Sequence, residues 1–310
     1  MIFLKKASIA LLTSAALMTG SAAMADDKPV VGLVMKSLAN EFFRDMLEGT
    51  KEHAARRGDY ELRAVGMQNE TDFQSQINAV ENFITQGADI IVIAPADSRA
   101  MVRPLKKAME AGVIVINFDV ALDAEAKKKQ GVELAFIGPD NRDGARLAGE
   151  ALAKKLGKGA KVVIVEGNPG ADNAHERKLG FEDAIKSGEL NLIDSRTAHW
   201  ETEEANTVFS NMLTAHPDIQ GVMAANDSMA IGVIKALESA GRAGDIQVVA
   251  FDNIPAVGPM IKDGRLLATV DQFGREMAAN AIDKGLDVLK GAPELKGWVK
   301  TPIKLVTSEN

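Results

Sequence analysis

Polar and aromatic side chains follow one short apolar run after another along this chain, at the point where each run ends. Their types are ammonium, guanidinium, carboxylate, carboxamide and aromatic ring. The set is Lys36, Asn40, Phe42, Phe43, Asp119, Arg177, Trp200, Asn226, Asp252 and Gln272. In open α/β sheets, ligands bind in the crevice outside the carboxyl ends of the strands. We therefore expect these side chains to converge on one binding cleft.

The residue types in this set match a ligand with many hydroxyl groups and an apolar ring face. Asp119 and Asp252 can each accept hydrogen bonds from two adjacent hydroxyls, and Arg177 offers a planar fork of donors. Carboxamides both donate and accept, and aromatic rings can lie flat against the C–H groups of a sugar ring. The set therefore predicts a small-molecule monosaccharide or a related polyol as the ligand.

Several of these residues also have a purely structural interpretation. Asn40 is a good helix N-cap, and Phe43 fits the apolar stripe of the helix that follows it. Asp119 and Asp252 could cap turns or pair across the cleft, and Arg177 could form a surface ion pair. These alternatives stay open at the level of sequence.

The sequence contains no motif for covalent, phosphate or metal chemistry. Neither G-x-x-x-x-G-K-[ST] nor G-x-S-x-G occurs, and no G-x-G-x-x-G follows the first apolar run. His175 and Glu176 start like a zinc signature, but Leu179 occupies the place of the second histidine. We therefore expect a protein that is not an enzyme and has no cofactor and no metal. The enzyme alternative is a sugar-modifying α/β enzyme with Asp119 and Asp252 as its acid and base.

The composition limits the remaining classes of function. The chain has 310 residues, no cysteine and a formal net charge of -7. This length suggests about two domains, since single cores rarely grow beyond roughly 250–300 residues. The missing cysteine excludes disulfides, thiolate metal sites and a lipidated N-terminal cysteine. The acidic balance argues against a nucleic-acid partner, because phosphate backbones are bound by clustered Lys and Arg.

Residues 1–25 have the pattern of a secretory signal peptide. Lys5 and Lys6 precede an apolar run, and Ala23-Met24-Ala25 fits an A-x-A cleavage site. The apolar run, of about twelve residues, is shorter than the roughly 20 that span a bilayer. We therefore expect export to the periplasm and removal of this peptide.

Short strands alternate with amphipathic helices over the rest of the chain. Near-continuous Val and Ile runs are typical of parallel strands that are buried on both faces. Ten strands are many for one such sheet, so we expect an α/β fold of two doubly wound parallel-sheet lobes, with about five strands each. The predicted strands are Val30–Met35, Leu62–Val65, Ile90–Ala94, Val113–Asn117, Leu134–Ile137, Lys161–Val165, Leu192–Arg196, Gly221–Ala224, Gln247–Ala250 and Leu267–Val270.

Six patches of sequence carry a resemblance to a known family. They are Ser37-Leu38-Ala39-Asn40-Glu41-Phe42-Phe43, Gly138-Pro139-Asp140-Asn141, Arg177-Lys178-Leu179-Gly180-Phe181, Ala225-Asn226-Asp227-Ser228-Met229-Ala230, Val249-Ala250-Phe251-Asp252 and Ala268-Thr269-Val270-Asp271-Gln272. From about Pro29 to the C-terminus, the chain resembles periplasmic monosaccharide-binding proteins of the ribose, allose and galactose class. These proteins share their lobes with the sensor domains of lac-repressor-type regulators.

The resemblance implies a type I periplasmic binding protein fold, with two lobes joined by a three-strand hinge. It implies an N-terminal lobe of residues 28–138 plus 273–300 and a C-terminal lobe of residues 139–272 plus 301–310. A sugar would bind between the lobes, which close around it, and the protein would deliver it to an inner-membrane ABC permease. Nine of the ten residues above, all except Lys36, match the family's ligand positions. We expect a monomer, and an added role as sugar receptor for a chemotaxis transducer stays open.

Two positions bear on which sugar is bound. Ribose binders resemble this chain but carry a small hydroxyl residue in place of Lys36 and an arginine in place of Val120. Allose binders have lysine at the first position. Lys36 could donate to a ligand hydroxyl, compensate Asp119 or have a structural role. Because Val120 removes a donor, the resemblance favours a pyranose aldose or a related polyol over plain ribose. A DNA-binding regulator with the same lobes is disfavoured, because the lobe begins directly behind the signal peptide.

Overall fold

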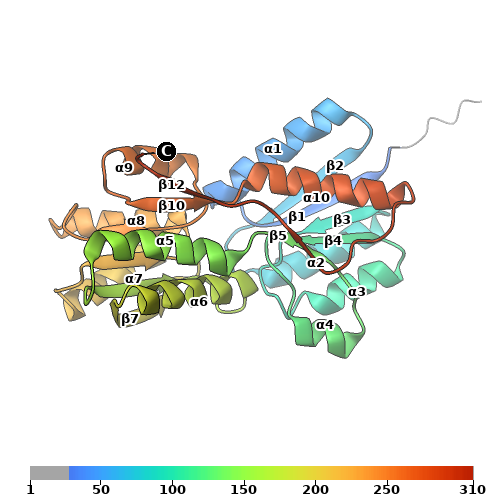
Figure 1. The fold of residues 1–310 in the computed structure, drawn as a ribbon. Helices are drawn as coiled ribbons and strands as arrows, with labels where there is room; N and C mark the ends of the chain where they lie inside the picture. Colours follow the sequence, from blue (N-terminus) through green and yellow to red (C-terminus); the bar gives the residue numbers. More distant parts are fainter. Residues whose placement is uncertain (1–27, 310) are drawn as a thin grey trace, which may run out of the picture.

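The computed structural model describes residues 28–309, and the predicted signal peptide lies outside the described residues. The described chain forms two lobes that lie side by side, each built around its own sheet with helices on both faces (Figure 1). Among residues 28–309, no helix is long and apolar enough to cross a membrane.

The first sheet has six strands, and every neighbouring pair is parallel. Strand β1 pairs with β2 on one side and with β3 on the other, which is the order of a doubly wound sheet. In spatial order the strands are β11 (Trp298–Lys300), β5 (Phe136–Gly138), β4 (Ile114–Phe118), β3 (Ile90–Ile93), β1 (Val30–Ser37) and β2 (Glu61–Met67).

The second sheet repeats this order with one difference at its edge. β12 runs antiparallel to β10, while the other neighbouring pairs are parallel. In spatial order the strands are β12 (Lys304–Thr307), β10 (Ala268–Asp271), β9 (Gln247–Val249), β8 (Gly221–Ala224), β6 (Lys161–Glu166) and β7 (Asn191–Thr197).

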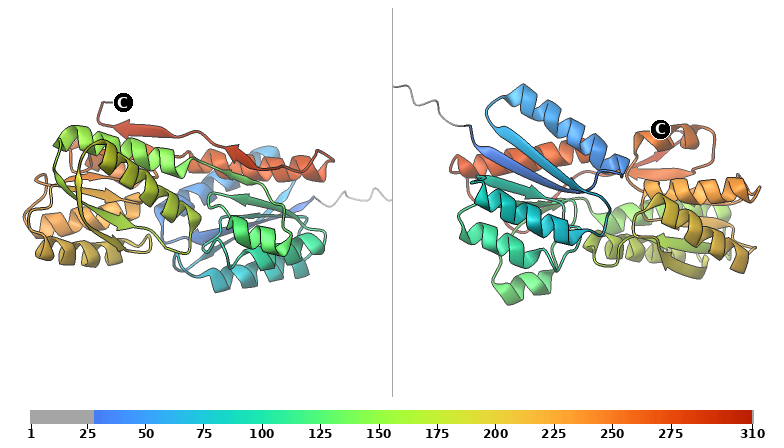
Figure 2. Two further views of the ribbon diagram at one scale, coloured as in Figure 1. Left: turned by 60° about the horizontal axis from the view of Figure 1, so that its bottom comes forward. Right: turned by 180° about the vertical axis from the view of Figure 1, so that it is seen from behind.

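Helices cover both faces of each sheet, so the central strands are buried on both sides. On the first sheet, α1 and α10 lie together on one face and α2 and α3 lie on the other (Figures 1 and 2). The helices are α1 (Glu41–Arg57), α2 (Phe73–Thr85), α3 (Val102–Glu110), α4 (Ala124–Gln130), α5 (Asn141–Leu156), α6 (Asp172–Ser187), α7 (Thr202–Ala215), α8 (Asp227–Ser239), α9 (Gly258–Lys262) and α10 (Gly274–Leu289), with a 3₁₀ turn at Pro255–Val257.

The alternation of side chains along β1 explains why this strand needs apolar residues at almost every position. Val31, Leu33 and Met35 are fully buried in the core that α1 and α10 share, whereas Val34 is fully buried in the core beneath α2. Successive side chains of a strand point to opposite faces, so a strand that is covered on both faces must be apolar throughout. The Val and Ile runs seen in the sequence have this cause.

The chain crosses from one sheet to the other three times. The crossings lie between β5 and α5, between β10 and α10, and between β11 and β12. Figure 2 shows the last of them, where the C-terminal segment leaves the first lobe and ends on the second. The α/β class with two doubly wound lobes is confirmed.

The expectation of five strands per lobe is wrong, because each sheet has six. The ten predicted strands all occur, with ends that shift by a few residues, but β11 and β12 were not predicted. Both are short edge strands on the outer side of their sheets, and their side chains are half-buried or exposed. Such strands lack the apolar run by which buried strands are recognised.

Candidate functional site

A small cavity lies between the lobes, at the carboxyl ends of strands from both sheets. The structure brings all ten residues predicted from the strand ends together around it, and adds Asn173 to its lining. The lining residues are Lys36, Asn40, Phe42, Phe43, Asp119, Asn173, Arg177, Trp200, Asn226, Asp252 and Gln272.

Aromatic rings reach the cavity from both lobes. Phe42 and Phe43, in the first turn of α1, form an edge-to-face pair with ring centroids 5.2 Å apart. Trp200 comes from the loop between β7 and α7 of the other lobe and is 3% exposed. The Lys36 ammonium lies between these surfaces, 5.4 Å from the Phe43 ring and 5.1 Å from the Trp200 ring. Apolar contact is thus available to a ligand from two sides.

Arg177 and its partners form a buried network on the second lobe. The Arg177 guanidinium donates to Asn141 Oδ1 at 2.9 Å and to the Ala225 carbonyl at 2.8 Å, and it stacks 3.7 Å from the Phe251 ring centroid. Asp252 Oδ1 accepts from Arg177 at 3.3 Å and from Gln272 Nε2 at 2.7 Å. Arg177 is 2% exposed, so the surface ion pair considered for it is wrong.

Three cavity residues hold a left-handed backbone conformation, which non-glycine residues rarely adopt. The φ angles are 63° at Asp119, 73° at Trp200 and 115° at Asp252. Such conformations cost on the order of 1–3 kcal/mol each and cluster at functional sites. All three residues lie where the chain turns sharply after a strand, and this turn directs their side chains into the cavity.

Four buried polar atoms in the cavity lack a hydrogen-bond partner among the described residues. Three are acceptors, namely Asp119 Oδ1, Asn173 Oδ1 and Gln272 Oε1, and one is the donor Trp200 Nε1. A buried polar group without a partner costs about 1–3 kcal/mol. The three acceptors and one donor, next to aromatic surface, match a compact ligand with several hydroxyl groups.

Burial acts strongly on the two carboxylates of the cavity. It raises the pKa of Asp119 to about 6, against the opposing attraction of Lys36 and Arg177. It also raises the pKa of Asp252 to about 7, again against the attraction of Arg177. A ligand that donates hydrogen bonds to these carboxylates would therefore stabilise their charged forms.

Two of the three asparagines of the cavity are helix N-caps as well. Asn40 Oδ1 accepts from the Phe42 amide at 3.0 Å and from Ser228 Oγ, on the other lobe, at 3.2 Å. Asn226 Oδ1 accepts from the Met229 amide at 2.9 Å. The capping alternative for Asn40 is thus confirmed. Both lone pairs of the Asn40 oxygen are used by these contacts, so Asn40 can offer a ligand only its amide N–H groups.

Lys36 pairs with a residue that the sequence analysis missed. Its ammonium lies 2.9 Å from Glu70 Oε2, and it also attracts the charged form of Asp119, so it pairs with Glu70 while compensating Asp119 electrostatically. Glu70 follows β2, and Asn173 lies one helical turn before Arg177 on α6. Extending the strand-end rule to β2, and the i, i+4 rule to Arg177, would have found both. Arg177 lies in the second turn of α6, which begins at Asp172.

Metal binding has no support in the geometry. Within residues 28–309, no group of three or more His, Cys, Asp or Glu side chains is placed to hold a metal ion. The cavity instead combines carboxylate, guanidinium, ammonium and amide groups with three aromatic rings. This combination suits binding of a neutral polyhydroxylated molecule.

Comparison with known proteins decides the family. The family model described as "Periplasmic binding protein domain" matches residues 31–293. The chain belongs to the periplasmic binding protein family. This family consists of binding proteins for ABC transporters rather than enzymes, so an acid and base pair of Asp119 and Asp252 is not supported. Membership also implies a location in the periplasm.

Similar proteins in this family are named for sugars. The chain is 46% identical over 286 residues to the D-ribose/D-allose-binding protein of Pseudomonas aeruginosa, covering 91% of this chain and 90% of that protein. It is 32% identical over 275 residues to the D-allose-binding periplasmic protein of Escherichia coli, covering 85% and 88%. An ABC transporter periplasmic solute-binding protein from Actinobacillus succinogenes, crystallised with bound D-allose, superimposes with a TM-score of 0.86 at 36% identity, covering 91% and 98%. This periplasmic binding protein is thus a sugar-binding component of an ABC importer.

Proposed function

We propose that this protein binds a neutral aldose in its pyranose form, D-allose or a close relative such as D-ribose, in the cavity between the lobes. The observation that carries this proposal is the set of unpartnered polar atoms, Asp119 Oδ1, Asn173 Oδ1, Gln272 Oε1 and Trp200 Nε1, beside aromatic rings. Sugar hydroxyls can donate to the three acceptors and accept from the indole N–H. The rings of Phe42 and Trp200 would contact the apolar faces of the sugar.

The choice of D-allose rests on Lys36 and Val120 together with the names of the relatives. Lys36 Nζ forms an ion pair with Glu70, and its ammonium can donate to a ligand in the cavity that Lys36 lines. Val120 is fully buried and does not line the cavity, so it supplies no donor there. Relatives named for both D-ribose and D-allose support an aldose of this size.

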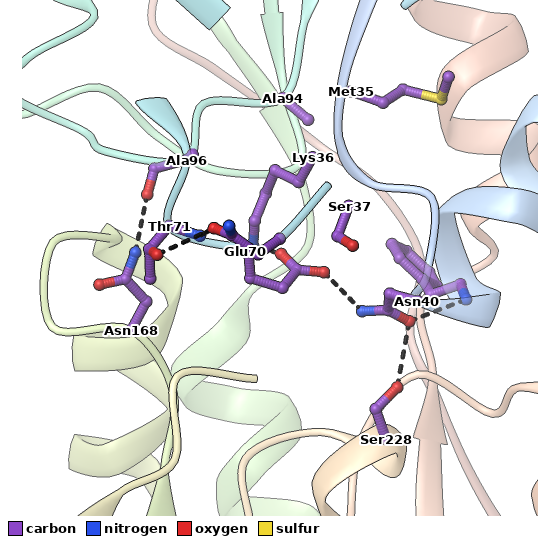
Figure 3. Close-up of polar contacts among 12 residues, drawn as sticks. Met35, Lys36, Ser37, Asn40, Glu70, Thr71, Ala94, Ala96, Asn168 and Ser228 are labelled. Carbon is purple, nitrogen blue, oxygen red and sulfur yellow. Dashed lines mark hydrogen bonds and ion pairs between the residues drawn. The ribbon is translucent and has the colours of Figure 1, made fainter. Parts of the chain in front are cut away.

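We propose that binding works by closure of the two lobes, residues 28–138 plus 273–300 and residues 139–272 plus 301–310. Hydrogen bonds between the lobes support a closed arrangement. Asn168 Nδ2 donates to the Ala96 carbonyl at 3.0 Å, and the Ser98 amide donates to the Gly170 carbonyl at 2.9 Å (Figure 3 shows the first). A ligand that binds only the closed form shifts the population toward it. The closed form then offers a composite surface to the permease, with the protein acting as a monomer.

The N-terminal segment enters the proposal as an export signal. Residues 1–25 would direct the chain to the periplasm and be removed after Ala25, so the mature protein would begin at Asp26. Mass spectrometry of protein from the periplasmic fraction measures this directly. A mature mass that includes residues 1–25 would contradict cleavage.

A thermal-shift panel tests the ligand. D-Allose, D-ribose, D-fucose, D-arabinose, myo-inositol and D-glucuronate should each be added at millimolar concentration to protein freed of co-purified ligand by unfolding and refolding. Ligands that bind only the native state raise the melting temperature by mass action. We expect D-allose or D-ribose to give the largest increase and the anionic sugar to give none. A panel in which no aldose raises the melting temperature would overturn the proposal.

A further inference from the structure

Glu70 is a buried acid that touches two cavity residues but does not itself line the cavity. It lies in the turn between β2 and α2 and is 1% exposed. Its Oε2 pairs with Lys36 Nζ at 2.9 Å, and its Oε1 accepts from Asn40 Nδ2 at 2.9 Å. Figure 3 shows its carboxylate beside Asn40, which in turn contacts Ser228 of the other lobe. Both oxygens of Glu70 are therefore used to hold ligand-facing donors.

Lys36 needs this partner because its ammonium is buried. The residue is 3% exposed, and Glu70 is its one ion-pair partner among residues 28–309. Breaking a buried ion pair by removing one charge is strongly destabilising, because the other charge stays buried without compensation. The Phe43 and Trp200 rings near the ammonium offer only cation–π attraction.

Without Glu70, the cavity acid that attracts Lys36 is Asp119. The two side chains already interact electrostatically, yet Asp119 Oδ1 has no hydrogen-bond partner among the described residues. Glu70 holds the ammonium on its own carboxylate and so keeps Asp119 Oδ1 free. A Lys36 released from Glu70 would turn toward Asp119 and occupy the acceptor that the proposed ligand needs.

Glu70 also fixes which donors remain. It takes one N–H from Asn40, whose oxygen is used by Phe42 and Ser228, so the amide group cannot rotate freely. The second N–H of Asn40 and the N–H groups of the Lys36 ammonium are left to the cavity that both residues line. The backbone amide of Glu70 donates to Glu201 Oε1 of the other lobe at 3.0 Å, next to Trp200, which ties this group of side chains to the closed arrangement.

We propose that Glu70 is a positioning residue for sugar binding, which holds Lys36 and Asn40 as donors toward the ligand and prevents Lys36 from pairing with Asp119. The proposal rests on the proposed function, because its ligand is the aldose proposed to bind between the lobes. It assigns a role in affinity to a residue that does not contact the cavity. The effect of Glu70 on sugar affinity must therefore depend on the presence of Lys36, and this dependence can be measured.

A double-mutant cycle between positions 70 and 36 tests the proposal. The proteins are wild type, Glu70→Gln, Lys36→Met and the double variant, each titrated with D-allose by calorimetry. Gln at position 70 keeps an oxygen for Asn40 but removes the charge that Lys36 needs. We expect Glu70→Gln to weaken binding at least tenfold in wild type and to change it less than threefold in the Lys36→Met background.

Melting temperatures without sugar supply a second cycle, which holds even if Lys36→Met binds too weakly to titrate. Glu70→Gln should lower the melting temperature in wild type and raise it in the Lys36→Met background, where it removes a buried unpaired carboxylate. Glu61→Gln is the matched control, because Glu61 is an exposed acid on β2 and its loss changes the net charge equally. We expect it to leave affinity unchanged.

Two results would overturn the role of Glu70. One is D-allose affinity within threefold of wild type in Glu70→Gln. The other is an equal loss of affinity, or an equal drop in melting temperature, from Glu70→Gln in both backgrounds, which is what a merely structural role predicts. If wild type binds neither D-allose nor D-ribose, the proposed function has failed instead, and the cycle of melting temperatures still reports whether Glu70 and Lys36 are coupled.

Discussion

Asp119 and Asp252 make proton release part of ligand binding. Burial raises the pKa of Asp119 to about 6 and that of Asp252 to about 7, so both carboxyls are partly protonated in slightly acidic solution when no ligand is present. Sugar hydroxyls that donate to the carboxylates favour the charged form and lower both pKa values in the complex. Binding must then release protons in this pH range.

The predicted consequence is an affinity for D-allose that rises with pH from about 5 to about 8. The sign follows from linkage, since the complex holds fewer protons than the free protein between the free and bound pKa values. The stability of the ligand-free protein depends on pH with the opposite sign. Because the pKa values of Asp119 and Asp252 are raised in the folded state, the stability that these groups contribute is lost as pH rises through about 6 to 7.

Calorimetry in buffers of different ionisation enthalpy measures the released protons. Asp119→Asn should remove the step near pH 6 and weaken binding at pH 8 at least tenfold, about 1.4 kcal/mol. Affinity that is independent of pH in wild type, or the same proton release in Asp119→Asn, would contradict this assignment.

The residues that the sequence predicted well are those that stand directly after a strand. Asp119, Trp200 and Asp252 follow β4, β7 and β9 closely, so their convergence follows from strand order alone. Glu70 also follows a strand, but its role as the partner of Lys36 could not be predicted. A partnership between the ends of two different strands leaves no pattern in one sequence, since it depends on the register and the turn that join them.

Two strands were also not predicted from the sequence pattern. β11 and β12 escaped prediction because short edge strands are half-exposed and carry no continuous apolar run, although β12 changes the topology of its sheet. The cores were predictable because helices on both faces demand Val and Ile at successive positions. The sequence pattern did not show which helix residues shape the cavity, and Gly274 is one of these residues.

Gly274 begins α10, and the absence of its side chain gives room to a cavity ring. A Cβ at this position would lie 2.6 Å from Phe42 Cε2, which real contacts do not allow. We predict that Gly274→Ala displaces Phe42 and weakens D-allose binding at least fivefold, with a small drop in melting temperature. Gly258→Ala is the matched control, because Gly258 has φ of -53° and ψ of -47° and a Cβ there would meet nothing within 4 Å. Equal affinity in the two variants would contradict this role of Gly274.

At the scale of the molecule, the cavity exists only because two lobes face each other across three chain crossings. Phe42 and Asp119 come from the first lobe, and Arg177 and Trp200 come from the second. Contacts that cross the cleft, such as Asn168 to Ala96 and Ser228 to Asn40, are made only when the lobes are close together. Neither lobe alone can satisfy a sugar with hydroxyls on both sides of its ring.

The central claim is that an aldose binds between the lobes and closes them. Small-angle X-ray scattering of the ligand-free protein, with and without saturating D-allose, tests it most directly, with calorimetry on the same samples to establish that the sugar is bound. We predict that the radius of gyration falls on addition of D-allose and does not fall on addition of D-glucuronate. D-Allose that binds by calorimetry while the radius of gyration stays unchanged would contradict the account.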